Sequence, residues 1–248
     1  MMGRIAFVGA GPGAADLLTL RAARLLQQAD VVLHDALTGA ELRALAPQAR
    51  WIDVGKRGFR ASTPQHVICA LLARLGHEHE LVVRLKGGDP GVFGRLDEEL
   101  QAVREAGLEF EIVPGISAAL AAAAQTARPL TRRGSGRSVA LCTAVTRDGQ
   151  VRGMRSCDTE VYYMAGRRLG ALARELQAAG WPGHTPVSVV SRAGCGDALH
   201  SDHALAELGR AALLHAGRPS VVVVGVGAEP VGEACAASPR TGATAVAR

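Results

Sequence analysis

The sequence predicts an α/β protein with two domains, and three observations support this. The chain has 248 residues, 48% of them hydrophobic, which is enough for two small domains with apolar cores. Short apolar runs alternate with segments of helical periodicity. The pattern changes at Pro114-Gly115, where an alanine-rich and then an arginine-rich segment begin. We therefore expect an N-terminal domain at 1–114, a C-terminal domain at 115–229 and a disordered tail at 230–248.

The first half predicts a parallel sheet. Short apolar runs predict strands at 5–8, 31–33, 51–54, 81–85 and 110–113. Segments of helical spacing predict helices at 17–26, 64–75 and 96–106. Strands that alternate with helices form parallel sheets with helices packed on the faces.

The second half predicts a second layered unit of strands and helices. Its predicted strands lie at 138–142, 160–164, 187–190 and 220–224. Its predicted helices lie at 117–124, 168–179 and 204–214.

Composition and charge narrow the functional classes. No apolar run approaches the length that spans a bilayer, so we expect a cytoplasmic protein with no membrane partner. The five cysteines are scattered without a C-x-x-C pair, and we expect no metal site. The net charge of +5 and pI of about 9.3 favour an anionic partner. The arginines are dispersed and aromatics are few, so we expect no nucleic-acid partner.

A first glycine loop, Gly9-Ala-Gly-Pro-Gly-Ala14, closes the first predicted strand and satisfies the dinucleotide pattern G-x-G-x-x-A. An acidic residue for a ribose would be available at Asp30 or Asp35. Pro12 argues against this interpretation, because it removes a backbone N–H from the turn that should bind a pyrophosphate. A nicotinamide-dependent dehydrogenase therefore remains an alternative prediction.

A second glycine loop, Lys86-Gly-Gly-Asp-Pro-Gly-Val-Phe-Gly94, also follows a strand and precedes a helix. It should lie at the same carboxyl edge of the sheet as the first loop, where open α/β folds bind ligands. Asp89 is either an acceptor for a ligand hydroxyl or ammonium group, or a helix cap in a plain turn. Lysine occurs only at Lys56 and Lys86, both in glycine-containing segments, which is a weak indication of function.

The motifs together resemble those of the tetrapyrrole methylases, in particular the uroporphyrinogen-III C-methyltransferase branch. The resemblance covers roughly residues 3–227, and the Arg-Leu-Lys-Gly-Gly-Asp-Pro run is specific to this branch. The motifs that carry it are Gly9-Ala-Gly-Pro-Gly13 with Leu17-Leu-Thr19, Val54-Gly-Lys-Arg57, Val83-Arg-Leu-Lys-Gly-Gly-Asp-Pro90, Phe93-Gly-Arg95, Val113-Pro-Gly-Ile-Ser-Ala118 and Pro129-Leu-Thr131.

The resemblance implies a homodimer whose chains each bind S-adenosylmethionine in a cleft between two α/β domains, without a metal. The reaction it implies transfers two methyl groups to ring carbons of uroporphyrinogen III, giving precorrin-2 for sirohaem or cobalamin. The donor contacts that it implies are Pro12, Gly87, Gly88, Asp89, Val92, Ser117, Ala118, Met164 and Gly194.

The same resemblance assigns roles on the acceptor side. It implies Asp35 as proton acceptor and Lys56 as proton donor. It implies Arg95 and Arg133 as binders of the substrate's carboxylates, with Glu98 as an acidic partner. An anionic tetrapyrrole would explain the positive net charge.

The chain departs from the family pattern mainly on the acceptor side. Ala36 replaces an arginine, Leu96 and Asp97 replace glycines, Gly91 replaces an aromatic residue, and Arg132 replaces histidine. Asp97 would place a negative charge near a polycarboxylate. These departures leave another corrinoid precursor open as the acceptor.

Overall fold

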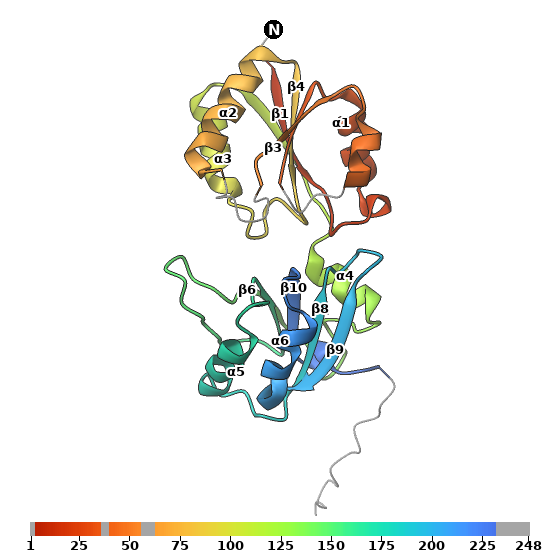
Figure 1. The fold of residues 1–248 in the computed structure, drawn as a ribbon, viewed down its shortest axis with the longest axis vertical. Coiled ribbons are helices and arrows are strands. Elements are labelled where there is room, and N and C mark those ends of the chain that lie inside the picture. The colour runs from red at the N-terminus through yellow and green to blue at the C-terminus, as the bar shows by residue number, and fades with distance from the viewer. Residues whose placement is uncertain (1–2, 36–39, 56–62, 232–248) are drawn as a thin grey trace, which may run out of the picture.

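The computed structural model describes residues 3–35, 40–55 and 63–231. It contains two five-stranded sheets, which lie one above the other in Figure 1. The predicted tail lies outside the described residues from residue 232 onward.

All neighbouring strands of the first sheet run parallel, as predicted. The spatial order is β3-β2-β4-β1-β5. The carboxyl ends of these strands therefore share one edge, which faces the second sheet in Figure 1. The strands are β1 (Arg4–Gly9), β2 (Val31–His34), β3 (Arg50–Asp53), β4 (Leu81–Lys86) and β5 (Glu109–Val113).

Helices cover both faces of the first sheet (Figure 1). On one face, α1 (Leu20–Gln28) and η2 (Ala40–Leu45) pack against a core that includes Leu26 and Val83. On the other face, α2 (Gln65–Glu78) and α3 (Leu96–Glu105) bury side chains such as Leu72 and Val103. The helix predicted from residue 17 begins three residues later, at Leu20, after a short 3-10 turn, η1 (Ala15–Leu17). Thr19 sets this start, because its Oγ1 accepts the Ala22 N–H at 3.2 Å.

The second sheet is mixed, with the order β6-β7-β10-β8-β9. β6 and β7 are parallel and the other neighbours are antiparallel. The strands are β6 (Val139–Thr143), β7 (Thr159–Tyr163), β8 (Pro186–Ser191), β9 (Leu199–Ala204) and β10 (Ser220–Gly225).

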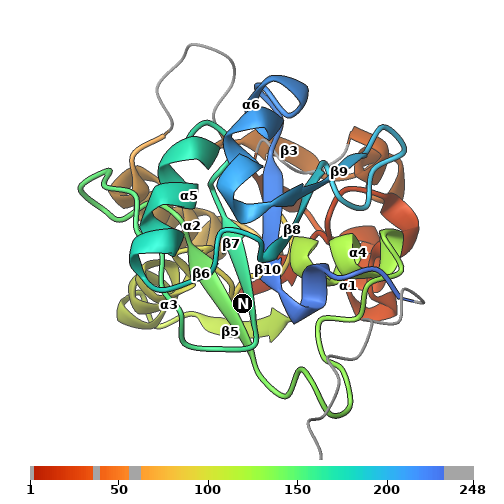
Figure 2. The same cartoon turned by 90° about the horizontal axis from the view of Figure 1, so that it is seen from below.

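Helices also cover both faces of the second sheet, as Figure 2 shows. α4 (Ala118–Gln125) packs on the face that carries Val161 and Val223. The opposite face is covered by α5 (Leu169–Ala178), η3 (Leu205–Arg210) and α6 (Ala211–Leu214), and η4 (Val226–Ala228) follows β10.

Two elements of the second half differ from the prediction. β9 was not predicted, because Leu199-His-Ser-Asp-His-Ala204 lies at the sheet edge, has no fully buried residue and lacks an apolar pattern. The helix predicted at 204–214 is a 3-10 segment followed by one short α-helical turn. Gly209 lies in this segment and packs closely on Gly170 of α5, and glycine disfavours a continuous helix.

No helix within the described ranges combines the length and apolar character needed to cross a membrane.

Candidate active site

Loops that follow β1 and β4 are joined at the carboxyl edge of the first sheet. Gly11 and Gly88 exchange backbone hydrogen bonds, with N···O distances of 3.2 and 2.8 Å. The Ala10 N–H also donates to the Lys86 carbonyl at 2.7 Å. The two glycine loops, whose paired residues Gly11 and Gly88 are 77 residues apart in the sequence, thus form one structural unit.

The loop after β5 completes this unit, and only glycines fit where the three loops touch. A Cβ at Gly115 would lie 2.2 Å from the Gly88 oxygen and 2.8 Å from the Gly9 Cα. These neighbours are backbone atoms, which cannot rotate away as a side chain can. Glycine is therefore required here because three backbones approach one another.

Asp89 braces the second and third loops. Its Oδ1 accepts the Gly91 N–H at 2.8 Å, and its Oδ2 accepts the Gly115 N–H at 3.0 Å. The structure shows Asp89 stabilising a turn but not capping a helix, because α3 begins after Arg95 and has no side-chain cap. A contact with the methyl donor stays a prediction.

The second sheet contributes the opposite wall. The Ala14 N–H donates to the Gly194 carbonyl at 3.1 Å. Pro12 also lies close to Gly194, because a Cβ on Gly194 would be 2.4 Å from the Pro12 Cγ. At the end of β7, the Tyr163 hydroxyl lies 2.5 Å from the Ser117 Oγ. The Tyr163 ring also packs on Phe93 from the second glycine loop, with centroids 5.2 Å apart.

These contacts bring together the segments that carry the predicted donor residues. Met164 directly follows Tyr163 and is exposed, with a positive φ of 60°. Val92 donates its N–H to the Asp89 carbonyl. The predicted donor residues that lie on these joined loops are Pro12, Gly87, Gly88, Asp89, Val92, Ser117, Ala118, Met164 and Gly194.

The first loop offers few backbone donors to a pyrophosphate. The N–H groups of Ala10, Gly11 and Ala14 already donate to carbonyls of neighbouring loops, and Pro12 has none. A dinucleotide site needs such groups to point at the phosphates. The geometry thus disfavours the nicotinamide alternative.

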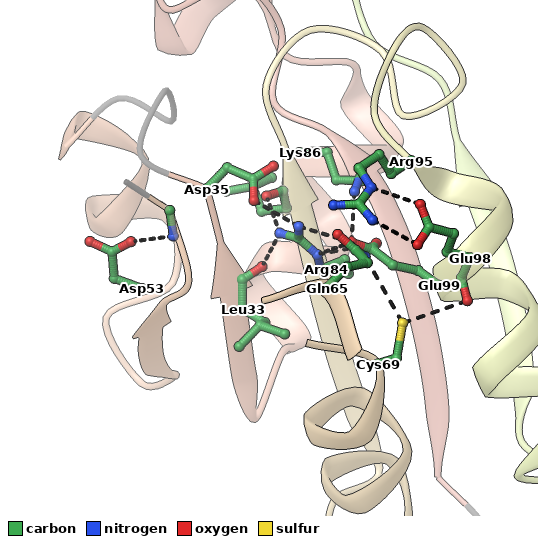
Figure 3. A network of polar contacts seen from close by, with 12 residues as sticks. Leu33, Asp35, Asp53, Gln65, Cys69, Arg84, Lys86, Arg95, Glu98 and Glu99 are labelled. Atoms are coloured by element: carbon green, nitrogen blue, oxygen red, sulfur yellow. Dashed lines mark hydrogen bonds and ion pairs between the residues drawn. The ribbon is translucent and has the colours of Figure 1, made fainter. Parts of the chain in front are cut away.

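A network of buried charges lies behind the site (Figure 3). Glu99 is fully buried, and its Oε1 accepts hydrogen bonds from Lys86 at 2.9 Å and Gln65 at 3.1 Å. Arg84, which is 2% exposed, donates its Nε to both Glu99 oxygens at 3.2 Å. The negative charge of Glu99, which has no contact with solvent, is thus balanced by the positive charges of Arg84 and Lys86.

Asp35 is the solvent-exposed member of this network. It follows β2, and its Oδ1 accepts a hydrogen bond from the Arg84 Nη2 at 2.7 Å. Its side chain is 32% exposed, whereas those of Arg84 and Glu99 are buried. The predicted proton acceptor therefore lies at the carboxyl edge, held by a buried arginine. The predicted proton donor, Lys56, lies outside the described residues.

The pKa values of the two buried cations move in opposite directions. Burial alone would lower the pKa of Arg84, but the charges of Asp35 and Glu99 outweigh burial and raise it. The pKa of Lys86 is lowered, first by burial and then by the charge of Arg84, and Glu99 offsets this only in part. The charged form of Lys86 thus depends on Glu99.

Arg84 and Glu99 were not predicted as site residues, although the sequence holds a signal for each. Arg84 interrupts an apolar strand that the fold buries on both faces. Glu99 lies three residues after Leu96 and four before Val103, on the buried side of α3. A charge in each of these positions indicates a buried ion pair, but its partner cannot be identified from the spacing.

Arg95 and Glu98 form an exposed pair beside the second glycine loop. The Arg95 Nε and Nη2 each donate to a Glu98 oxygen at 2.7 Å. The pKa of Glu98 lies below its ordinary value, first because of the hydrogen bonds and charge of Arg95, and further because of Arg147 and Lys86. Arg147, on the loop between β6 and β7, was not predicted, and its charge acts on this pair from the second sheet.

The structure does not bring Arg133 to this group within one chain. Arg133 is exposed on a turn closed by a hydrogen bond of 2.8 Å from the Arg132 N–H to the Gly136 carbonyl. Gly136 packs on Val226, just beyond the end of β10, whereas the start of β10 pairs with Ser191 near the glycine loops. The length of β10 separates the two ends by roughly 17 Å.

Most of the family departures have a structural role here. Leu96 packs against the core, and Asp97 lies exposed in the first turn of α3, where the helix dipole favours a negative charge. The Arg132 guanidinium donates to the Glu229 and Pro230 carbonyls. Gly91 donates its N–H to Asp89, and Ala36 lies outside the described residues.

Within the ranges that the structure describes, no group of three or more His, Cys, Asp or Glu side chains is arranged to hold a metal ion.

Comparison with known families identifies the chain. Residues 4–209 match the family described as Tetrapyrrole (Corrin/Porphyrin) Methylases. The chain belongs to this family. Among tetrapyrrole methylases it is similar to the uroporphyrinogen-III C-methyltransferase of Pseudomonas aeruginosa, at 42% identity over 91% of this chain and 94% of that protein.

Two further relatives are informative. Siroheme synthase 1 of Pectobacterium atrosepticum is 45% identical over 77% of this chain, which spans only 41% of that protein. The crystal structure of uroporphyrin-III C-methyl transferase from Thermus thermophilus, complexed with S-adenyl homocysteine, superposes with a TM-score of 0.80 and 36% identity. That match covers 91% of this chain and 98% of the Thermus chain.

Proposed function

We propose that this protein transfers methyl groups from S-adenosylmethionine to two ring carbons of uroporphyrinogen III, giving precorrin-2. One observation carries this proposal. The loops after β1, β4 and β5 form a single backbone-lined unit that faces Gly194 and Tyr163 of the second sheet. The Thermus relative with this fold is complexed with S-adenyl homocysteine, the demethylated product of such a donor.

The glycine loops suit a donor that needs close backbone contact. A Cβ on Gly88 would have only the Ser117 Cα near it, at 3.9 Å, so a ligand can approach the backbone there. Tyr163 fixes the Ser117 hydroxyl at the start of α4, so this group is held in place before a ligand binds. We propose that the nine predicted donor residues contact S-adenosylmethionine from these segments.

The chemistry requires alignment and removal of a proton. A reduced tetrapyrrole presents electron-rich pyrrole carbons, which attack the sulfonium methyl directly, so the protein mainly aligns the two reactants. A carbon–hydrogen bond of the methylated product must then break, and its proton needs an acceptor. We propose Asp35 as this acceptor, because it is partly exposed at the carboxyl edge, and Lys56 as the proton donor.

The acceptor side explains the positive charge of the chain. Uroporphyrinogen III is a polycarboxylate, and we propose that Arg95 binds its carboxylates beside Glu98. Arg133 would meet a substrate only outside the cleft of its own chain, for instance across the homodimer that we propose. Light scattering of the purified protein tests this homodimer.

A second acceptor is supported by two observations. Arg95 is already paired with Glu98, and Asp97 adds a further negative charge beside it. Both features weaken the attraction for a polycarboxylate. A different corrinoid precursor is therefore the alternative acceptor.

The deciding experiment incubates the purified protein with labelled S-adenosylmethionine and uroporphyrinogen III and follows the product by mass spectrometry. We expect a doubly methylated tetrapyrrole. Binding of S-adenosylhomocysteine without methyl transfer would support the alternative acceptor. Failure to bind either form of the donor would refute the methyltransferase proposal.

The catalytic roles predict a separation of binding and turnover. We expect Asp35→Asn and Lys56→Ala to bind S-adenosylhomocysteine like the parent protein, while kcat falls by about 10²–10⁴-fold, the usual contribution of a positioned acid or base. Calorimetry measures the binding and a labelled methyl-transfer assay measures kcat. Full turnover in either variant would remove the role of that residue.

A further inference from the structure

All five N–H donors of the Arg84 guanidinium have partners. Nε donates to Glu99, and Nη2 donates to both Glu99 and Asp35. Nη1 donates to the carbonyls of Leu33 and Leu85, at 3.4 and 3.2 Å. A planar guanidinium with every donor engaged cannot rotate without breaking several hydrogen bonds. The direction from which Arg84 meets Asp35 is therefore fixed by the core of the sheet.

We infer that Arg84 is a positioning residue for methyl transfer, which holds the Asp35 carboxylate in its productive orientation, and that Glu99 sets the orientation of Arg84. This inference rests on the proposed role of Asp35 as the proton acceptor. Figure 3 shows Arg84 between the two carboxylates, with Glu99 on its buried side.

The charge balance supports this assignment. Arg84 and Lys86 carry two positive charges, and Glu99 and Asp35 carry two negative charges, so these four described side chains are neutral together. Three of its members are at most 3% exposed, and Asp35 alone reaches solvent to a third of its surface. A buried ion pair would be sufficient for a purely stabilising role, whereas this network extends to the partly exposed carboxylate of Asp35 at the site.

The same network ties the proton acceptor to the donor loop. Lys86 binds the Glu99 Oε1 that also binds Arg84, and Lys86 directly precedes Gly87. The Lys86 carbonyl accepts the Ala10 N–H of the first glycine loop. The Asp35 carboxylate and the two glycine loops are thus fixed relative to one another through neighbouring residues of β4. In the transfer, the O–H bond at Asp35 forms as the C–H bond breaks, and the electron pair stays in the tetrapyrrole.

The test compares variants that change Arg84 with little change in charge balance. The double variant Arg84→Met/Glu99→Gln removes one cation and one anion together. Arg84→Lys keeps the positive charge but loses the planar guanidinium with its five N–H donors. S-adenosylhomocysteine titration counts the folded sites, so that kcat is expressed per site. Arg74→Met is the matched control, because Arg74 is exposed on α2 and paired with Glu78.

We expect kcat per site to fall by about 10–100-fold in the double variant, as for a misplaced catalytic group, and by less in Arg84→Lys. The KM for uroporphyrinogen III and the Kd for S-adenosylhomocysteine should stay within about twofold of the parent, and Arg74→Met should match the parent throughout. Introducing the double variant into Asp35→Asn should cause no loss of kcat beyond that of Asp35→Asn alone, because both changes act on the same carboxylate.

Three outcomes would contradict the inference. Parental kcat per site in both Arg84 variants overturns it, as does a loss that appears equally in donor affinity, which indicates a purely structural role. Losses that multiply with that of Asp35→Asn also overturn it. If the double variant does not fold, Arg84→Lys decides. The proposed role of Asp35 fails separately, when Asp35→Asn itself retains full turnover, and the methyltransferase proposal fails when the parent protein binds neither form of the donor.

Discussion

Replacing Glu99 with alanine is expected to lower the free energy of unfolding by about 3–5 kcal/mol, the usual cost of removing one partner from a buried ion pair. Glu99 is fully buried and accepts hydrogen bonds from Arg84, Lys86 and Gln65. Without it, Lys86 loses its main compensating charge and Arg84 loses one of its two carboxylate partners. Because about 1 kcal/mol changes the midpoint of thermal unfolding by about 2–4 °C for a chain of this length, calorimetry should show a clear decrease.

Glu98→Ala is the matched control for this prediction. Glu98 neighbours Glu99 on α3 and also accepts two hydrogen bonds from an arginine, but its side chain is 44% exposed. Water solvates both charges of an exposed ion pair, so the pair adds little stability and the melting temperature of Glu98→Ala should stay close to that of the parent protein. Equal effects of the two substitutions would show that burial of Glu99 does not govern its contribution.

Replacing Gly194 with alanine is expected to weaken binding of S-adenosylhomocysteine by about tenfold or more, measured by calorimetry. Gly194 has a φ of +80°, a conformation that costs other residues about 1–2 kcal/mol, so the substituted loop should relax away from it in the unbound protein. Binding would then have to restore this conformation, and each 1.4 kcal/mol of that cost is about a tenfold change in Kd. The added Cβ would also lie 2.4 Å from the Pro12 Cγ and force the two walls of the site apart.

Gly196→Ala tests whether this effect is specific. Gly196 lies two residues further along the same loop, and a Cβ there would have no neighbour within 4 Å. The affinity of Gly196→Ala for S-adenosylhomocysteine should equal that of the parent protein. A similar loss in both variants would mean that the loop responds to any substitution, and unchanged affinity in Gly194→Ala would remove Gly194 from the donor site.

Much of the fold could be predicted from the sequence, because local patterns encode it. Alternating apolar runs and helical segments predicted all five strands of the first sheet and its parallel arrangement. In the second half the prediction missed β9, since an exposed edge strand needs no apolar pattern. Helix starts also shifted, as at Thr19, because side-chain caps set them.

The candidate site was only partly predictable. The parallel topology placed the two glycine loops at one edge, and the structure joins them through Gly11 and Gly88. The resemblance named Arg133 with Arg95, whereas the structure places Arg133 at the opposite end of the second sheet. Sequence order says little about distance once a chain crosses a sheet.

By itself, the sequence determined the α/β character of the chain, the position of its glycine loops and its resemblance to the methylases, because periodicity and motifs are local properties. Only the tertiary structure decided how Asp89 braces the loops and how Arg84 connects Glu99 with Asp35. These partners lie 26, 15 and 49 residues apart in the sequence. Hydrogen bonds over such separations depend on how strands and helices pack, which no local pattern encodes.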